Sequence, residues 1–331
     1  MLDLRRLRVL RAVHHHGTVT AAAESLHLTP SAVSQQIRQL SRDLGVPLLE
    51  PEGRRIRLTS AAHVLLRHAD AMTTRWEQAL ADLAAHAEGE TGPLRMCGYP
   101  TGVSTLLAPA TALLRRTHPA MDVSVAEAES AESFDLLLAG AADLALVVPE
   151  PGFPPVDDGR FDQRLLVDDP QDLLVPAGHP LAGRAFVRLA DTAHEDWVAS
   201  HRPDCDHGRM VQVACAAAGF TPRIVHHAAD WIAVTALVCS GLGISLVPRL
   251  LPLAAEHDVV RVRLSGEVRP ARSILTVVRS GADQHPAIRR GMAALHEIAR
   301  ASWDDDAWPG PRPAADAPAA TGAGARSGAG R

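Results

Sequence analysis

The spacing of apolar residues before residue 60 limits the fold of this chain more than any other feature. Apolar residues at helical spacing predict a first helix that ends at Gly17. A short second helix is expected over residues 21–26, with Thr18 or Thr20 as its N-cap. The buried positions expected in the first helix are Leu4, Leu7, Val9, Leu10 and Val13.

A third helix follows with strong start and stop signals. Thr29 is a good N-cap, and Pro30 occupies the first helical position, where its missing N–H costs nothing. Gly45 predicts the end. The expected buried face holds Val33, Ile37, Leu40 and Leu44, and the opposite polar face holds Ser31, Ser34, Gln35, Arg38 and Arg42. A helix, a short helix, a tight turn and a polar-faced helix are typical of a helix-turn-helix.

Residues 48–59 extend this unit. They predict two short strands around Glu52-Gly53, a hairpin that carries arginines at its tip and forms a wing. Arginine reads guanine and glutamine reads adenine in a major groove, whereas wing arginines contact phosphate or the minor groove. Without the flanking helices, the same residues would be read as a solvated helix face and surface arginines. The residues expected to contact DNA are Ser31, Ser34, Gln35, Arg38, Arg54, Arg55 and Arg57.

The charge distribution agrees with a local nucleic-acid site. Residues 1–60 hold nine arginines against five acidic residues, a net charge of +4, while the whole chain carries −5. The remainder therefore carries −9. A basic module attached to an acidic body is the asymmetry expected of a nucleic-acid-binding unit joined to a second function.

A long helix is expected directly after the wing. Residues 60–88 contain neither glycine nor proline, and a hinge follows at 89–93. The apolar stripe of this helix needs a partner helix, so we expect a homodimer. The stripe consists of Leu65, Ala69, Met72, Trp76, Ala79, Leu80, Leu83 and Ala87.

From Leu94 onward, short strands alternate with helices, which predicts an α/β fold with mainly parallel sheets. One such strand, over 172–177, is expected to open the second half. Two sheets facing each other across a cleft form a small-molecule receptor. We expect one lobe from 93–164 with 268–302 and another from 165–267. Residues 303–331 are rich in Ala, Gly and Pro, which predicts a disordered tail.

The chain resembles the LysR-type transcriptional regulators over about residues 2–300. The similarity rests on stretches in both halves, including A-A-A-E-S-L-H-L-T-P-S-A-V-S-Q-Q-I-R-Q-L (21–40), D-L-L-V-P-A-G-H-P-L (172–181) and A-L-V-C-S-G-L-G-I-S-L-V-P (236–248). The resemblance implies an N-terminal winged helix-turn-helix (1–59), a linker and dimerisation helix with hinge (60–92) and a periplasmic-binding-protein-like effector domain (93–302). It also implies promoter DNA, a small-molecule effector, a homodimer or homotetramer and RNA polymerase as partners.

Three departures from the family pattern affect DNA recognition. Pro30-Ser31 stands where the family usually has Gln-Pro, and Leu49 and Pro51 replace the usual Phe and Arg. Ala62 replaces a usual Gly. The fold is expected to survive these changes.

The resemblance also points to residues that would face the effector. Tyr99, Thr101 and Ser104 follow the first strand of the effector domain and open a helix, where free N–H groups and hydroxyls favour an anion; ordinary helix capping is the alternative. His201 and Arg202 lie in a polar loop, where an arginine would pair with an anionic metabolite. A solvated loop is one alternative, and a zinc site formed by His201, Asp204, Cys205 and His207 is another. Trp231 lines the same cleft or simply packs.

Other functions were weighed against this one. Cys205 and Cys215 lie ten residues apart, as in peroxide-sensing members of the family, so a redox-sensing regulator is an alternative, although Cys215 also fits as a buried helix residue. A solute-binding module without DNA is the second alternative. We find no catalytic motif and expect no enzyme and no cofactor.

Metal and membrane binding are likewise not expected. His14, His15 and His16 lack the i, i+4 spacing with a carboxylate that favours a metal, so they are interpreted as surface residues. Neither a signal peptide nor a membrane span is indicated, which predicts a cytoplasmic protein.

Overall fold

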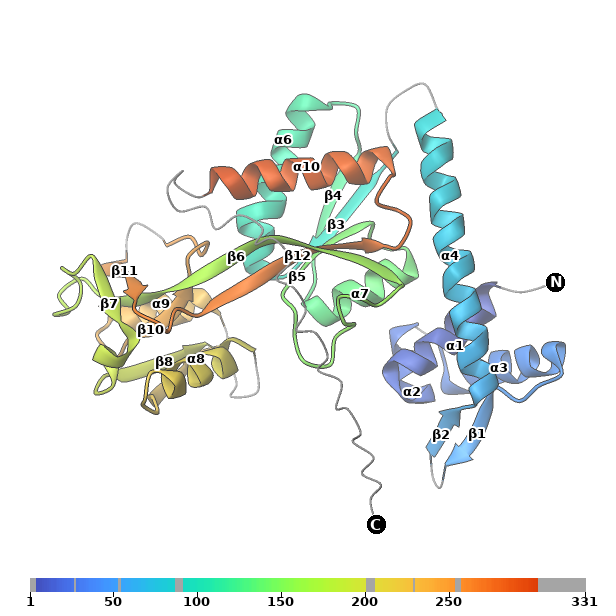
Figure 1. The fold of residues 1–331 in the computed structure, drawn as a ribbon, viewed down its shortest axis with the longest axis horizontal. Helices are drawn as coiled ribbons and strands as arrows, with labels where there is room; N and C mark the ends of the chain where they lie inside the picture. Colours follow the sequence, from blue (N-terminus) through green and yellow to red (C-terminus); the bar gives the residue numbers. More distant parts are fainter. Residues whose placement is uncertain are drawn as a thin grey trace, which may run out of the picture.

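The computed structural model describes residues 4–26, 28–52, 55–86, 92–200, 206–228, 230–253 and 257–302 (Figure 1). Residues 4–58, which we call the head, and residues 92–302, the body, are joined by one long helix. The expected disordered tail at 303–331 and most of the expected hinge at 89–93 lie outside the described residues.

The head contains three helices and a hairpin: α1 (Leu4–His16), α2 (Val19–Ser25), α3 (Pro30–Leu44), β1 (Leu49–Glu52) and β2 (Arg55–Leu58). The side-chain oxygen of Thr18 caps α2, and that of Thr29 caps α3 by accepting a hydrogen bond from the Ala32 N–H at 3.2 Å. Gly45 ends α3 in the left-handed conformation. The second helix therefore begins two residues earlier than expected.

One core holds the head together. Leu10, Val33, Ile37 and Leu48 are buried in it, and residues from the first turns of the long helix join them. Leu44 was expected to be buried but is 39% exposed. This expectation is wrong because Leu44 lies in the last turn of α3, beyond the turns whose side chains enter the core.

The long helix α4 (Ser60–His86) continues from the wing and rests on both parts of the molecule. Its first half is buried against the head through Ala62, Leu66 and Ala69. Its second half contacts the body, where Arg279 Nε lies 2.7 Å from Glu77 Oε1. A Cβ at Gly281 would lie 2.5 Å from the Thr74 carbonyl oxygen, so this close approach requires glycine.

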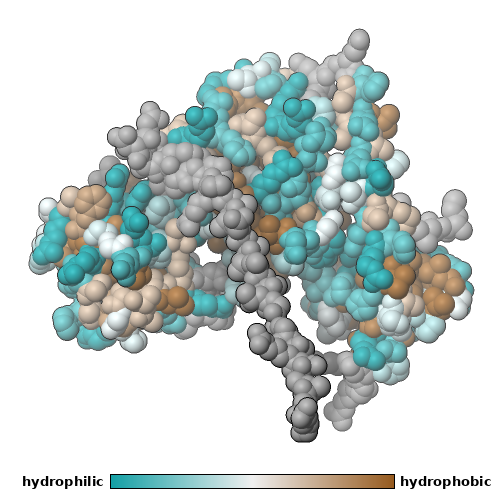
Figure 2. Space-filling model, viewed as in Figure 1, coloured by the Kyte–Doolittle hydropathy of each residue, from teal (hydrophilic) through white to brown (hydrophobic). Residues whose placement is uncertain are grey.

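Much of the expected apolar stripe of α4 is exposed on this single chain. Met72 is 42% exposed, Trp76 62% and Leu83 66%. Large apolar side chains in this row mark an association surface. Figure 2 shows other hydrophobic residues around the end of α3, where Leu44 and Val46 are exposed.

The body consists of two lobes linked by two long strands (Figure 1). Lobe I contains β3 (Leu94–Gly98), α5 (Pro100–Gly102), a π-helical turn (Val103–Leu107), α6 (Ala108–Thr117), β4 (Val123–Glu127), α7 (Ser130–Ala139), β5 (Leu144–Val147) and α10 (Pro286–Ala301). Lobe II contains β7 (Phe186–Arg188), a 3-10 turn (Leu189–Thr192), β8 (Asp196–Ser200), α8 (Asp206–Ala217), β9 (Arg223–Ala228), α9 (Trp231–Cys239), β10 (Ser245–Pro248) and β11 (Val259–Ser265). The linking strands are β6 (Phe161–Pro176) and β12 (Ala271–Arg279).

The sheet is less parallel than the sequence predicts. The β3–β4, β3–β5, β7–β11 and β8–β9 pairs are parallel. β6 and β12 pair antiparallel with each other, β6 pairs antiparallel with β10 and β11, and β12 pairs antiparallel with β5. The strand expected at 172–177 is the end of β6, which runs through both lobes. Asp168, Asp169 and Gln171 interrupt its apolar pattern, which is why the sequence shows only part of it.

Candidate nucleic-acid interface and ligand site

The polar face of α3 points away from the core of the head. Ser31, Gln35 and Arg38 are exposed and Ser34 is half-buried, while the opposite face of the helix fills the core. The Ser31 hydroxyl lies 3.0 Å from the Thr29 hydroxyl at the N-cap. The helix therefore presents its amide, guanidinium and hydroxyl groups from a rigid, well-capped frame, which is the arrangement that major-groove recognition requires.

The last turns of α3 are held by polar contacts. Asp43 pairs with Arg6 of α1 and accepts a hydrogen bond from Gln39 Nε2 at 2.7 Å. Arg42, on the predicted polar face, donates to Gln39 at a short distance. These contacts tie the end of α3 to α1 and leave the earlier turns of the face to meet a partner.

The wing carries a cross-strand ion pair. Glu50 faces Arg57 in the β1–β2 register, and their charged atoms are 2.8 Å apart on an exposed surface. Part of the positive charge of Arg57 is therefore neutralised in the free protein. Arg54 lies outside the described residues, and the structure describes only the backbone of Arg55.

Between the lobes, an arginine occupies the crossing of the two linking strands. Arg272 of β12 faces Asp169 of β6, and its Nε donates to Asp169 Oδ2 at 3.0 Å. The Asp169 side chain is fully buried and that of Arg272 is 14% exposed. Burial raises the pKa of Asp169, and the Arg272 charge and the Leu250 amide act against that rise. The carboxylate thus orients a desolvated guanidinium.

Lobe I contributes the residues that surround this guanidinium. The Arg272 carbon lies over the Tyr99 ring, 5.2 Å from its centroid, and Arg272 Nη2 lies 3.3 Å from Thr101 Oγ1. A Cβ at Gly102 would lie 3.0 Å from the Tyr99 ring, so glycine gives the ring its space. Burial raises the pKa of Tyr99 to about 12, and its hydroxyl forms no hydrogen bond with another described residue.

Lobe II contributes an aromatic pair. The rings of His207 and Trp231 meet edge to face, with centroids 4.8 Å apart, and His207 Nε2 lies 3.3 Å from Gln171 Oε1 on β6. Burial, followed by the charge of Arg272, lowers the pKa of His207 to about 3. His207 is therefore a neutral imidazole at neutral pH. We call the group across the two lobes the interlobe cluster; it comprises Tyr99, Thr101, Asp169, Gln171, His207, Trp231 and Arg272.

Only some residues of the interlobe cluster are among the effector-binding residues predicted from the sequence. Tyr99, Thr101 and Trp231 belong to it, whereas Ser104 is exposed and donates to the Thr101 carbonyl oxygen at 3.1 Å, as a local cap does. His201 and Arg202 lie outside the described residues. Asp169 and Arg272 are not among the effector-binding residues that the sequence predicts. The signal it could have used is the run of acidic residues within an otherwise apolar strand.

Three cysteines are described. Cys97 and Cys215 are fully buried, and burial raises the pKa of their thiols to about 11 and about 12. Cys239 is half-buried. The Cys97 and Cys215 thiols are poor nucleophiles because they stay protonated. Cys205 lies outside the described residues.

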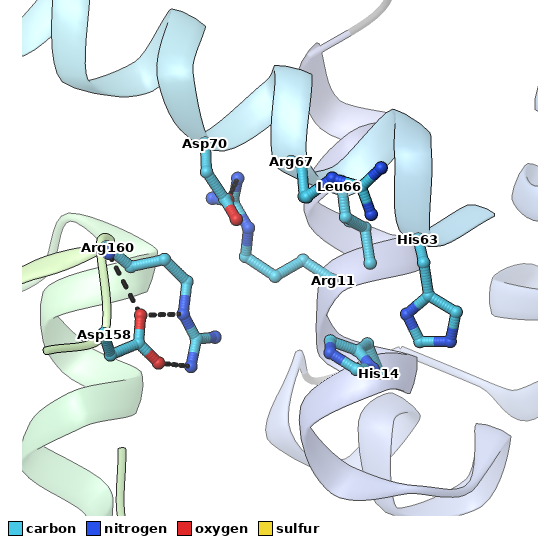
Figure 3. A pocket seen from close by; sticks show the side chains of 8 residues that line it. All are labelled: Arg11, His14, His63, Leu66, Arg67, Asp70, Asp158 and Arg160. Carbon is cyan, nitrogen blue, oxygen red and sulfur yellow. Dashed lines mark hydrogen bonds and ion pairs between the residues drawn. The ribbon is translucent and has the colours of Figure 1, made fainter. Parts of the chain in front are cut away.

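A cavity of about 240 Å³ lies between residues of the head and α4 on one side and residues of the body on the other (Figure 3). On one side Arg11 pairs with Asp70, and on the other Arg160 Nη2 lies 2.7 Å from Asp158 Oδ2. The cavity is lined by Arg11, His14, His63, Leu66, Arg67, Asp70, Asp158 and Arg160. None of the helices in the described part of the chain has the length and apolar character needed to cross a bilayer.

Comparison with known proteins places both halves in one family. Residues 4–63 match the bacterial regulatory helix-turn-helix protein, lysR family, and residues 87–300 match the LysR substrate binding domain. The DNA-binding transcriptional dual regulator OxyR of Escherichia coli strain K12 is 30% identical over 309 residues, which cover 92% of this chain and 96% of that protein.

Two further similarities extend over most of the chain. The hydrogen peroxide-inducible genes activator of Pectobacterium carotovorum is 29% identical and covers 85% of this chain and 91% of that protein. The crystal structure of CbnR, a LysR family transcriptional regulator, is 25% identical with a TM-score of 0.54, and the match covers 89% of this chain and all of that chain.

Proposed function

Because this chain belongs to the LysR family of transcriptional regulators, we propose that α3 and the wing bind promoter DNA and that an anionic small molecule bound at the interlobe cluster controls this binding. In this proposal, Ser31, Ser34, Gln35 and Arg38 contact base edges, and the wing arginines, including Arg54, Arg55 and Arg57, contact phosphates. The protein acts as a regulator in the cytoplasm, where the promoter is, and catalyses no reaction.

The polar face of α3, opposite an apolar face on which Val33, Ile37 and Leu40 are buried, supports DNA binding. Bidentate contacts from Gln35 and Arg38 would each contribute about 1–3 kcal/mol of discrimination between bases. The test is fluorescence anisotropy of the full-length protein on duplex DNA from upstream of its own gene, at two salt concentrations. The double variant Gln35→Ala, Arg38→Ala should lose sequence-selective binding.

The matched control removes an arginine elsewhere. Arg115 is exposed on α6 of lobe I, so Arg115→Ala should bind DNA as the wild type does. Failure of the wild type to bind any duplex at low salt would refute the proposal and leave the body to be studied as a solute receptor.

The orientation of Arg272 carries the effector half of the proposal. Asp169 pairs with the edge of the Arg272 guanidinium that carries Nε and Nη2. Arg272 Nη1 forms no hydrogen bond with another described residue. The Tyr99 ring lies against this guanidinium, and its hydroxyl has no hydrogen-bond partner among the described residues. A carboxylate or phosphate between the lobes would complete both groups, and Thr101, His207 and Trp231 would surround the rest of the molecule. Ser104, His201 and Arg202 stay in the proposal as sequence-based candidates.

This half is tested by thermal shift with a panel of small carboxylates and phosphate esters, each beside its neutral amide or alcohol. A true effector should raise the melting temperature, change DNA affinity and lose most of its effect in Arg272→Lys, because lysine cannot make a planar two-point contact. Arg263 is exposed on β11, so Arg263→Ala serves as the control. Equal shifts from neutral analogues would argue against an anionic effector.

The mechanism follows from where the ligand would bind. A molecule that contacts residues of both lobes binds the closed arrangement better than the open one, so it shifts the balance between states by its differential affinity. The exposed Met72, Trp76 and Leu83 on α4 support a homodimer that pairs into a tetramer. Changes between lobes would then alter the spacing of the DNA-binding heads and their contact with RNA polymerase.

Redox sensing is the second candidate, supported by relatives that are named as activators of hydrogen peroxide-inducible genes. The buried Cys215 thiol, with its raised pKa, argues for slow oxidation. Peroxide treatment followed by anisotropy, in the wild type and in Cys205→Ser, separates the two mechanisms. A peroxide-dependent change in DNA binding that Cys205→Ser abolishes would establish the redox alternative.

A further inference from the structure

Two histidines of the head meet one aspartate of the body. His15 and His16 end α1, and Asp135 lies on α7 of lobe I. Asp135 Oδ1 is 3.4 Å from His15 Nε2 and 3.7 Å from His16 Nε2. One ligand atom from each residue lies within 4.8 Å of the other two. Two elements that are distant in the sequence therefore point three donor atoms at one place.

These distances suit a tetrahedral cation. Ligands about 2.0–2.2 Å from a zinc ion at tetrahedral angles are about 3.3–3.6 Å from one another. The two measured contacts to the Asp135 oxygen are close to that edge, and rotation of the imidazoles would adjust the third. We propose that His15, His16 and Asp135 bind a divalent transition-metal cation such as Zn²⁺, with a fourth position left for water.

The donor set favours this class of cation over others. Imidazole nitrogens suit Zn²⁺, Cu²⁺ and Ni²⁺, whereas Ca²⁺ and Mg²⁺ prefer sites made of oxygen. The three side chains are partly shielded, with exposed fractions of 24%, 21% and 35%. Partial shielding removes competing water while leaving an entry path.

The position of the site gives it a consequence. α1 packs directly on α2 and α3. A cation that holds α1 to α7 would therefore fix α3, the helix proposed to read DNA, relative to lobe I. The neighbouring cavity, lined by Arg11 and Arg160 among others, leaves this part of the junction loosely filled (Figure 3). The cation would therefore act as a clamp between head and body and restrict the orientations that the head adopts on DNA.

The test uses untagged full-length protein, stripped with a chelator and desalted, so that no purification tag supplies histidines. Competition against a chromophoric zinc chelator should give one tight site per chain. Asp135→Asn keeps the shape of the side chain but weakens the ligand, and His16→Gln removes a nitrogen from the other side of the junction. Each should lower zinc affinity at least about tenfold, since even outer-sphere changes have effects of this size.

His14→Ala is the matched control, because His14 is the adjacent histidine but its ring packs on His63, with centroids 5.0 Å apart. Its zinc affinity should equal that of the wild type. Zinc should also raise the melting temperature of the wild type and of His14→Ala but not of Asp135→Asn, and the metal-free proteins should melt alike.

Two results would overturn the clamp. The first is an affinity that Asp135→Asn and His16→Gln leave unchanged, which would mean that the three residues form ion pairs only. The second is an equal loss in His14→Ala, which would mean that zinc binds a surface histidine run without lobe I. Both readouts are independent of DNA, so failure here does not touch the proposed regulator.

Discussion

The polar face of α3 and the interlobe cluster are built in opposite ways. The α3 face is made by consecutive turns of one helix, capped by Thr29 and ended by Gly45, and its side chains are exposed except for the half-buried Ser34. The interlobe cluster gathers residues from both lobes and the linking strands, and its charged pair is buried. A surface of the first kind loses binding when its side chains change, whereas one of the second kind loses stability first.

The largest effect is expected from Asp169→Ala. The substitution leaves the buried Arg272 charge without its carboxylate, and breaking a buried pair in this way costs about 3–5 kcal/mol. Urea unfolding followed by far-UV circular dichroism measures the loss. Asp162→Ala on the same strand removes a half-buried partner of the exposed Arg164 and should cost about 1 kcal/mol or less. Similar losses of stability from both variants would mean that burial does not make the Asp169–Arg272 pair more important to stability than the Asp162–Arg164 pair.

Gln35→Ala with Arg38→Ala should show the reverse pattern. Both side chains are exposed, so the free energy of unfolding should change by only about 0.5 kcal/mol. Selective DNA binding should weaken by about 3 kcal/mol, roughly a hundredfold or more, because two base contacts are lost. Anisotropy against specific and random duplexes measures this. A loss of binding accompanied by a large loss of stability would mean that the face is structural.

The same contrast explains how far the sequence predicts the molecule. Caps, stop signals and helical periodicity act over a few residues, so the head, the long helix and the strand–helix alternation are all visible in the sequence. The antiparallel pairing of β6 with β12 depends on contacts between segments about a hundred residues apart, such as Asp169 with Arg272. Nothing in either segment alone specifies that pairing.

The residues of the candidate sites differ in the same way: some have a local sequence signal, and others are brought together only by contacts between distant segments. Tyr99 and Thr101 were predicted because they follow a strand and open a helix, a local signal. The sequence places His207 only among the polar residues of its loop, because its contact with Trp231 and its position near the Arg272 charge depend on segments far apart in the chain. Similarly, no local pattern connects His15 and His16 with Asp135.

The pH dependence of stability should come from the body through His207. Its pKa is about 3 in the folded chain and about 6.5 when unfolded. Below pH 6.5 the unfolded chain binds a proton that the folded chain does not, so the free energy of unfolding falls as the pH drops toward 3. Between pH 7.5 and 5.0 this amounts to about 2 kcal/mol.

Urea unfolding of the wild type and of His207→Gln at both pH values isolates this contribution. The variant should show a smaller difference between the two pH values. His227 is exposed on β9, so His227→Gln should behave as the wild type. If His207→Gln kept the full pH dependence, the neutral state assigned to this imidazole would be wrong.

A smaller effect on stability tests whether the Thr29 N-cap stabilises the start of α3. Thr29→Ala removes the side-chain oxygen that accepts the Ala32 N–H and should destabilise α3 by about 1 kcal/mol. Ser31→Ala removes a neighbouring hydroxyl but leaves the cap, so its stability should stay close to that of the wild type. Thermal melting followed by circular dichroism distinguishes them. Equal losses would show that the hydroxyl pair, and not the cap alone, begins the helix.

Tyr99→Phe should have the smallest effect on stability, and its sign separates structure from function. The Tyr99 hydroxyl is buried without a partner among the described residues, so its removal should relieve a desolvation cost and stabilise the free protein by about 0.5–1 kcal/mol. The ring, which packs under Arg272 and against Gly102, is kept.

In the presence of an effector that contacts the hydroxyl, the variant should instead be the less stable protein, because it lacks one hydrogen bond to the ligand. Melting curves with and without the effector test this reversal. A variant that is less stable in both conditions would show that the hydroxyl has a structural partner and that the interlobe cluster is complete without a ligand.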